Sequence, residues 1–542
     1  MKLKLDDHFN QELPADLELT NGRRQVSGAA FSFVSPRVPS APKLLHASNE
    51  VAQLIGLSAE DLTSNDFLEI FSGARVPDGA RPYAMCYGGH QFGNWAGQLG
   101  DGRAINLCEV LHQNRRWTLQ LKGAGETPYS RTADGLAVLR SSLREHLCSE
   151  AMYHLGVPTT RSLSLIATGD DVMRDMMYDG NAAYEPGAVV CRVAPSFIRF
   201  GNFQIFAANG DAENLRRLAD YTIKHHFPAV IDGHESDSLI SNGANQYINF
   251  FRQVTDRTLD MVIHWQRVGF VHGVMNTDNM SIHGDTIDFG PYGWLEGYDH
   301  DWTPNTTDRQ HRRYRYGHQP QVALWNLLQL ANALYPLVED AEPLQEILHG
   351  FQSQFEIKYK SMMGEKIGLS NVTSADYELL ADLEETLQLT ETDMTIFFRL
   401  LANVDTSPVA EGEDDALASA IEIVADAFYK PAELTGDVMA GWRNWFRKYR
   451  IRLNQTEHSD ANRAAKMNRV NPKYVLRNYM AQLAIDAATE GDVTLIDELY
   501  QLLKQPYDEQ PDSEKRFSEK WFAKRPEWAR NKVGCSMLSC SS

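Results

Sequence analysis

Alternating apolar and polar residues predict that strands dominate the first two hundred residues. Residues 117–122 read WTLQLK, and the alternation within them would place Lys122 on the polar face of a strand. Residues 162–194 read as further strands, interrupted by a turn at residues 168–171. Glycines crowd residues 88–102, just before these strands, which indicates a loop whose backbone can approach a ligand closely.

The spacing of apolar residues also predicts helices. Leucine or alanine at every fourth position from Leu139 to Leu155 forms a buried stripe, and Gly156 then ends the helix. A long amphipathic helix is predicted from residue 246 through Trp265, and the pattern beyond residue 310 is mostly helical. Strands first and helices second indicate an α+β enzyme of two lobes, with its site in the cleft between them.

The chain divides into four predicted regions. These are an irregular N-terminal extension at residues 1–80, a strand-rich lobe at 81–195, a helical lobe at 196–400, and a helical C-terminal region at 401–542. The acidic stretch PVAEGEDDA at residues 408–416 is the best candidate for an internal loop.

Composition and charge narrow the function. The 542 residues are 43% apolar and 23% charged, which is typical of a globular protein. A net charge of −20 argues against a nucleic-acid-binding protein, which needs a basic face, but it allows a local basic pocket. No apolar run reaches the ~20 residues of a membrane span and the N-terminus lacks a signal sequence, so we expect a cytoplasmic protein without membrane contact. Six Cys residues in so long a chain indicate neither a disulfide scaffold nor a zinc site.

Asp288 and Asn279 give the clearest chemical signal. Asp288 opens the tripeptide Asp-Phe-Gly, and the preceding segment MSIHGDTIDFG predicts a strand, a tight turn near Gly284 and a second strand that delivers Asp288. An amide oxygen and a carboxylate brought together in this way form a hard oxygen site for Mg²⁺, which can bridge nucleotide phosphates. Alone, the tripeptide is better explained as a surface turn.

Lys122 and Glu145 add to this signal because they occur in the chain order of a protein kinase. Lys122 ends a strand, where a kinase has its phosphate-binding lysine, and the Gly-rich residues precede it. Glu145 lies on the following helix, off the buried stripe, where it can form an ion pair with Lys122. A solvated lysine and a surface glutamate are the alternatives for each residue by itself.

Val274 is the informative departure from the kinase pattern. Aligning HGVMNTDN with the kinase catalytic loop H-R-D-x-x-x-x-N places His272 on the His and Asn279 on the Asn, but Val274 on the catalytic Asp. Valine cannot accept a proton, so the chain is either an inactive kinase or an enzyme with a changed reaction. Asp278 is a carboxylate in the same loop, displaced from the usual position.

Two arginines favour the changed reaction. Arg192 lies in the strand-like run AVVCRVA, and Arg199 follows in SFIRFG. Arg is suited to bidentate phosphate binding, and two arginines with Lys122 carry more positive charge than the adenine end of a nucleotide needs. A triphosphate tail that points inward would place the α-phosphate near the metal and Asp278, with pyrophosphate as the leaving group. Structural ion pairs are the alternative for both arginines.

The chain resembles the selenoprotein O family of protein adenylyltransferases over nearly its whole length. The matching segments include YGGHQFGNWAGQLGDGRA, LQLKGAGETPYSRTADGLAVLRSSLREHL, CRVAPSFIRFGNFQ, HGVMNTDNMSIHGDTIDFGPYG, RYGHQPQVALWNL and MNRVNPKYVLRN. The resemblance implies a bilobal, protein-kinase-like fold in which ATP binds in a flipped orientation and AMP is transferred to protein hydroxyls.

The resemblance also implies a set of site residues. Asp278 would be the catalytic base, and Asn279 and Asp288 would hold Mg²⁺, with Mn²⁺ as an alternative. The N-cap of the following helix is a second reading of Asp134. The implied nucleotide contacts are Gly100, Gly102, Arg103, Lys122, Asp134, Gly135, Arg192, Arg199 and Asp288.

The tail GCSMLSCSS carries one more signal. Cys540 stands third from the end, where animal members of the family carry selenocysteine, and Cys535 precedes it. Such a pair on a flexible terminus could be redox-active, and an inert tail thiol is the alternative. No Cys lies between Cys191 and Cys535, so a disulfide from the tail to the segment after Asp288 is excluded.

The sequence therefore predicts an enzyme that moves AMP from ATP to Ser, Thr or Tyr hydroxyls of proteins and releases pyrophosphate. The enzyme itself is a further candidate acceptor. A kinase that transfers the γ-phosphate and a silent nucleotide-binding scaffold are the two alternatives. UTP as a donor is a variant of the first reading. No nucleic acid is expected among the partners.

Overall fold

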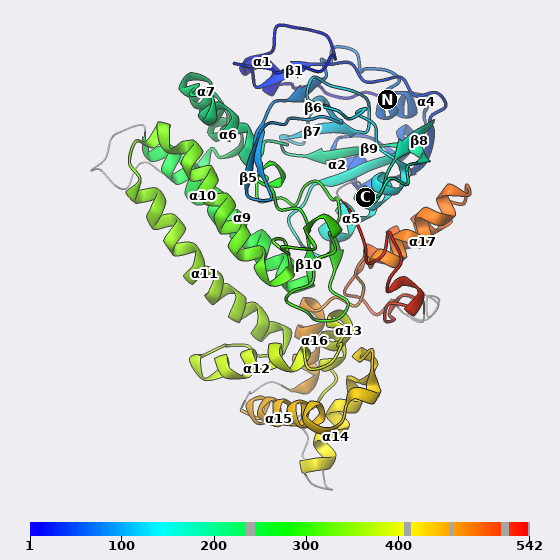
Figure 1. Cartoon of the computed structure of the whole chain (residues 1–542), viewed down its shortest axis with the longest axis vertical. Helices are drawn as coiled ribbons and strands as arrows, with labels where there is room; N and C mark the ends of the chain where they lie inside the picture. Colours follow the sequence, from blue (N-terminus) through cyan, green and yellow to red (C-terminus); the bar gives the residue numbers. More distant parts are fainter. Residues whose placement is uncertain (233–243, 406–412, 456–458, 511–519, 540–542) are drawn as a thin grey trace.

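The protein is a mixed α/β molecule in which an antiparallel sheet is followed by a long helical part (Figure 1). The computed structural model describes residues 1–232, 244–405, 413–455, 459–510 and 520–539. Most of the acidic stretch predicted as a loop at 408–416 lies outside the described residues, and its last part begins helix α14 (Glu413–Ile423). Within the described ranges, no helix is long and apolar enough to cross a membrane.

The sheet has seven strands, all paired antiparallel, in the order β1-β3-β6-β7-β9-β8-β2. The segment 1–80, expected to be irregular, supplies both edge strands, β1 and β2. Pairing with partners far along the chain creates these strands, which local alternation could not reveal. Their bounds are β1 (Phe31–Phe33), β2 (Lys43–Ala47), β3 (Tyr83–Met85), β6 (Ala104–His112), β7 (Arg115–Lys122), β8 (Arg161–Arg174) and β9 (Ala183–Ala194).

The turn predicted at residues 168–171 is wrong, because β8 runs straight through them. The register shifts there, so that three residues between Ala167 and Asp171 lie opposite the single residue Gly187 of β9. The Asp170 N–H donates to Thr168 Oγ1 over 3.2 Å, a local bond of the kind that turns also use. The turn-like residues therefore form a bulge within the strand.

The two helices predicted from apolar spacing are present, and the described chain beyond residue 310 is mostly helical, as predicted. Helix α5 (Leu139–His154) packs against β8 and β9, and α9 (Ala244–Val268) and α10 (Gln319–Val338) pack against each other. The other helices are α1 (Phe9–Glu12), α2 (Asn49–Leu54), α3 (Ala59–Leu62), α4 (Asn65–Ser72), α6 (Phe200–Ala208), α7 (Ala212–His226), α8 (Ala229–Asp232), α11 (Glu342–Lys366), α12 (Tyr377–Leu387), α13 (Met394–Leu401), α15 (Gly436–Leu453), α16 (Asp460–Val470), α17 (Asn478–Thr489) and α18 (Thr494–Leu503). Short strands β4 (Gly88–Gln91) and β5 (Asn94–Gln98) form one hairpin, and β10 (Phe270–Val271) pairs with β11 (Gly293–Trp294).

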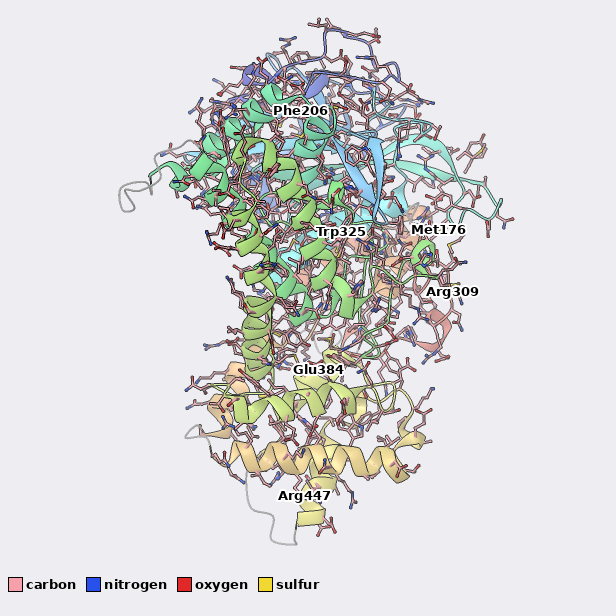
Figure 2. The ribbon with its side chains drawn as sticks, turned by 60° about the vertical axis from the view of Figure 1, so that its left-hand side comes forward. Met176, Phe206, Arg309, Trp325, Glu384 and Arg447 are labelled. Carbon is pink, nitrogen blue, oxygen red and sulfur yellow. The ribbon has the colours of Figure 1, made fainter. Side chains whose placement is uncertain are left out.

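Two hydrophobic cores organise these elements. The larger core joins the sheet to α9 and α10, and the smaller one lies among α12, α13 and α15. Glu384 and Arg447 mark the part of the molecule that holds the smaller core (Figure 2). Helices α17 and α18 leave this part and return to pack against α5, so the end of the chain helps to support the sheet (Figure 1).

Candidate active site

Asp288 is delivered by a narrow hairpin, as the sequence indicated, although its arms form single bridges in place of strands. Met280 bridges Thr286, and the chain turns at Gly284, whose φ is 71°. His272 holds this hairpin to the preceding loop through a 2.8 Å contact between its Nε2 and the Ile287 carbonyl oxygen. Asp288 itself has a φ of 56°, in the left-handed region that L-residues with a side chain rarely adopt. Such a conformation is typical of residues held in place for function.

Three cations surround the Asp288 carboxylate. Arg192 Nη1 lies 2.6 Å from Oδ1, Arg199 Nη1 lies 2.6 Å from Oδ2, and Lys122 Nζ lies 3.3 Å from Oδ1. Burial acts to raise the pKa of Asp288, but Arg199, Arg192 and Lys122 outweigh it and hold that pKa well below its ordinary value. Three predicted phosphate-binding side chains thus converge on one predicted metal ligand.

Helix α5 contributes the second carboxylate of this cluster. Glu145 Oε2 lies 2.6 Å from Lys122 Nζ, and its Oε1 lies 2.9 Å from Arg192 Nη1. The predicted Lys122–Glu145 ion pair is therefore present, and both partners are buried. Glu145 lies outside the apolar stripe, as predicted, and it is nevertheless buried, because its carboxylate faces Lys122 of β7 and Arg192 of β9. Burial also lowers the pKa of Lys122, against the opposing effects of Glu145 and Asp288.

Asp278 lies in a short 3₁₀ turn, Thr277–Asn279, beside this cluster. Its backbone carbonyl accepts a 2.8 Å hydrogen bond from Arg199 Nη1, and its Oδ2 accepts one of 3.3 Å from Gln91. Its Oδ1 is buried and makes no hydrogen bond to any described residue. Burial raises the pKa of Asp278 to about 6. A carboxylate oxygen without a partner can accept a proton from a hydroxyl placed beside it.

The Gly-rich residues form a hairpin over this turn, where the sequence predicted a phosphate-binding loop. The His90 N–H donates to Thr277 Oγ1 over 2.7 Å, and the Phe92 N–H donates to Asn276 Oδ1 over 3.1 Å. Gly89 is required for this approach, because a Cβ there would lie 2.7 Å from Asp278 Oδ1. Hairpin β4–β5 therefore contacts the loop that carries Asp278.

Gly100, Gly102 and Arg103 lie in the turn that leads into β6. A Cβ on Gly100 would meet the Tyr129 ring at 2.4 Å, and one on Gly102 would meet the Tyr129 carbonyl oxygen at 2.8 Å. Both positions therefore need glycine for packing. Arg103 is close enough to Lys122 for its charge to help lower the Lys122 pKa.

Asp134 and Gly135 lie in the segment before α5. Asp134 accepts two hydrogen bonds of 2.8 Å from Arg174 and one of 2.9 Å from the Leu136 N–H. The N-cap reading of Asp134 is wrong, since α5 begins at Leu139 and its N-cap residue is Val138. A Cβ on Gly135 would lie 2.2 Å from the Gly125 carbonyl oxygen, so the two backbones are in close contact.

Asn279 and Asp288 have the chemistry of a site for a hard cation. The Asn279 amide nitrogen donates to the Val274 carbonyl over 2.9 Å, which leaves its amide oxygen as the possible ligand. Asp288 is ionised, because its pKa is well below the ordinary value. An amide oxygen and an ionised carboxylate fit Mg²⁺.

Four site residues were missed by sequence reasoning. Gln120 accepts a hydrogen bond from Arg192, and Asp101 Oδ1 lies 3.9 Å from Arg199 Nη2. Gln120 could have been found, because it shares the polar face of β7 with Lys122. Gln91 and Asn276 gave no signal, since their roles depend on how the hairpin folds over the loop.

The C-terminal tail runs beside the segment that follows Asp288. The Leu538 carbonyl accepts a 2.7 Å hydrogen bond from the Thr306 N–H. Cys535 is buried, and burial raises the pKa of its thiol to about 11, which disfavours the reactive thiolate. Cys540 lies outside the described residues.

Known proteins match this chain over nearly its whole length. The family model for Protein adenylyltransferase SelO matches residues 17–504. A protein nucleotidyltransferase YdiU from Flavobacterium johnsoniae is 60% identical over 540 residues, which cover 100% of this chain and 99% of that protein. Relatives of the same name from Rhodopirellula baltica and Azoarcus sp. are 56% and 53% identical, each over 100% of this chain and 99% of the relative. Because the match spans the site and nearly all of the chain, this protein belongs to the SelO family of protein adenylyltransferases.

Proposed function

We propose that the chain transfers AMP from ATP to Ser, Thr or Tyr hydroxyls of proteins, on a bilobal kinase-like fold. The observation that carries this proposal is the convergence of Lys122, Arg192 and Arg199 on Asp288, deep between the sheet and the loop of Asp278. Three cations at the inner end of a site suit the β- and γ-phosphates of an inverted triphosphate. In that orientation the α-phosphorus lies on the side of Asp278.

The Asp288 carboxylate holds positions that phosphate oxygens would otherwise fill. A bound triphosphate offers oxygens to Arg192, Arg199 and Lys122, so Asp288 becomes free for a cation together with Asn279. A divalent cation at these two residues would neutralise charge that develops on the transferred phosphoryl group. Gly100, Gly102, Arg103, Asp134 and Gly135 complete the proposed nucleotide contacts.

The proposed reaction needs one proton acceptor and one anionic leaving group. Asp278 Oδ1 takes the proton of the acceptor hydroxyl, and the hydroxyl oxygen attacks the α-phosphorus of ATP. A phosphoester bond to AMP forms as the bond between the α-phosphorus and the bridging oxygen breaks. Pyrophosphate leaves with that electron pair, and Lys122, Arg192 and Arg199 stabilise its charge. Val274 at the usual kinase position argues against γ-phosphate transfer.

Labelled nucleotides separate this proposal from its alternatives. The purified protein is incubated with Mg²⁺ and either α-labelled or γ-labelled ATP, with and without candidate acceptor proteins. Covalent label from the α position alone is expected, and an Asp278→Asn variant should incorporate almost none. Label from the γ position would indicate a kinase, and no label from either position would indicate a scaffold. α-labelled UTP in a parallel reaction shows which nucleotide is preferred.

A further inference from the structure

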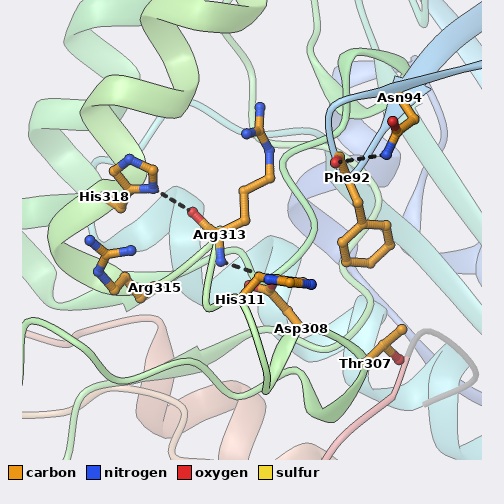
Figure 3. A pocket seen from close by; sticks show the side chains of 8 residues that line it. All are labelled: Phe92, Asn94, Thr307, Asp308, His311, Arg313, Arg315 and His318. Atoms are coloured by element: carbon orange, nitrogen blue, oxygen red, sulfur yellow. Dashed lines mark hydrogen bonds between the residues drawn. The ribbon is translucent and has the colours of Figure 1, made fainter.

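A cavity of about 590 Å³ opens between the β4–β5 hairpin and the segment 307–318 (Figure 3). Phe92 and Asn94 of the β4–β5 hairpin form one wall. The opposite wall comes from residues 307–318 and includes Asp308, Arg313, Arg315 and His318. The proposed nucleotide contacts are absent from the residues that line it, so the cavity is distinct from the cation cluster.

The wall at residues 309–318 is strongly basic. With Asp308 included, it reads DRQHRRYRYGH, which has four Arg, two His and one Asp, in a chain whose net charge is −20. Arg315 Nε pairs with Asp301 at 2.9 Å, so part of this charge is neutralised. Asp308 is turned toward the backbone of its own segment and accepts from the N–H groups of Arg313 and Tyr314 over 3.0 and 2.7 Å.

Of the two arginines that line the cavity, Arg313 is the one that forms no ion pair with a described carboxylate. Its guanidinium lies 4.7 Å from the centroid of the Trp325 ring and next to Gly93 at the tip of the hairpin. Its Nε makes no hydrogen bond to the described residues, and its interaction with the nearby Asp308 carboxylate is a charge effect that acts to lower the Asp308 pKa. The aromatic ring fixes the guanidinium in place without neutralising it. A fixed cation of this kind attracts and orients an anionic group.

The cavity and Asp278 are joined through Asn276. Asn276 Oδ1 accepts from the Phe92 N–H at 3.1 Å and from the Tyr314 hydroxyl at 2.6 Å, so it ties the two walls together. It also lies two residues before Asp278. A chain segment in the cavity would therefore run close to the residue proposed to deprotonate the acceptor hydroxyl.

We propose that this cavity binds an acidic stretch of the acceptor protein, next to the hydroxyl that receives AMP. The inference rests on the proposed function and adds the class of protein that is recognised. Arg313 supplies the fixed charge, and Arg315 and His318 line the same wall. Complementary charge favours encounter and selects among partners. The overall negative charge of the chain repels acidic proteins in general, which restricts their binding to this local basic surface.

The test uses two fluorescent peptides that contain one Ser, one Thr and one Tyr. One peptide has Asp and Glu on both sides of these residues, and the other has Asn and Gln. Fluorescence anisotropy gives the Kd of each peptide, and α-labelled ATP gives kcat and KM. We expect the acidic peptide to bind about tenfold more tightly, as charge-assisted hydrogen bonds imply. Arg313→Gln should remove most of this preference and raise KM more than it changes kcat.

Arg309→Gln is the matched control. Arg309 is exposed on the same basic segment and does not line the cavity, so the variant loses the same charge at a different place (Figure 2). Its preference for the acidic peptide should remain. Arg315→Gln, which should weaken the preference less because Arg315 is paired, provides a second variant if Arg313→Gln unfolds at a lower temperature.

Three results would overturn the inference. The first is equal Kd values for the two peptides. The second is a loss of preference for the acidic peptide in Arg309→Gln as large as the loss in Arg313→Gln. The third is displacement of the acidic peptide by inorganic phosphate at the concentration at which unlabelled peptide displaces it. The last result would show a simple anion site. Label incorporated without any peptide preference would remove the inference and leave the proposed function intact. Selective binding without label would support the docking site and count against adenylylation of these peptides.

Discussion

Replacing Glu145 with Gln tests the buried cluster that the proposed nucleotide site depends on. Lys122, Arg192 and Arg199 face the carboxylates of Glu145, Asp288 and Asp101. The variant keeps the shape of the side chain and leaves the cations short of one negative charge. Removal of one partner from a buried ion pair destabilises a protein by about 3–5 kcal/mol.

The expected effect has two parts, because Glu145 supports both folding and the position of Lys122. The free energy of unfolding should fall by about 3 kcal/mol or more. The affinity for ATP should fall about tenfold or more, since Lys122 loses the 2.6 Å contact that orients it toward the phosphates. Urea denaturation measures the first effect, and titration calorimetry with ATP measures the second.

Glu150→Gln is a control on the same helix. Glu150 is as buried as Glu145, with side-chain exposures of 3% and 2%, and it forms a bidentate pair with Arg161 at 2.9 and 2.7 Å. This variant should lose comparable stability but bind ATP as the wild type does. The reasoning is refuted if Glu145→Gln retains wild-type stability and affinity, or if Glu150→Gln loses ATP affinity equally.

Three further predictions concern the site and the pH dependence of stability. Asp278→Asn should lower AMP transfer about a hundredfold or more while ATP still binds, because it removes the proposed base and keeps its shape; full activity would exclude that role. Asp288→Ala should abolish most AMP transfer and its dependence on Mg²⁺. In the absence of ATP the variant should also have a lower Tm, because three cations lose their shared carboxylate. Unchanged Mg²⁺ dependence would remove the metal assignment. Burial lowers the pKa of His46 to about 4, below its value of about 6.5 in the unfolded chain. As the pH drops, the unfolded chain therefore binds a proton at His46 before the folded protein does. The free energy of unfolding should fall between about pH 6.5 and pH 4. Urea midpoints at several pH values measure this fall, which should be shallower in His46→Asn; equal slopes would contradict it.

Local pattern was enough to predict the residues that lie on regular strands and helices of the site. Alternation placed Lys122 on the polar face of β7, and Arg192 was placed on a strand. In the structure, Gln120 of β7 pairs directly opposite Arg192 of β9. The position of Glu145 on α5 followed from helical spacing. The order of these residues along the chain and the departure at Val274 then pointed to the chemistry.

Contacts between segments far apart in the sequence could not be predicted from the local pattern of apolar and polar residues. The burial of Glu145 depends on its contacts with Lys122 of β7 and Arg192 of β9, which helical spacing alone does not show. Residues 88–98 are rich in glycine, and this composition fits both a phosphate-binding loop and the hairpin that covers Asp278. The sequence alone could not distinguish the two. The edge strands β1 and β2 likewise exist only because the rest of the sheet pairs with them.

The identity of the leaving group tests the central claim most directly. Wild-type protein, Mg²⁺, ATP and an acceptor are incubated together, and pyrophosphate and ADP are quantified while intact mass spectrometry follows the acceptor. The amount of pyrophosphate should equal the amount of acceptor whose mass has increased by one AMP. Asp278→Asn should suppress both products. ADP together with an acceptor heavier by one phosphate would contradict the inward orientation of the triphosphate at Lys122, Arg192 and Arg199.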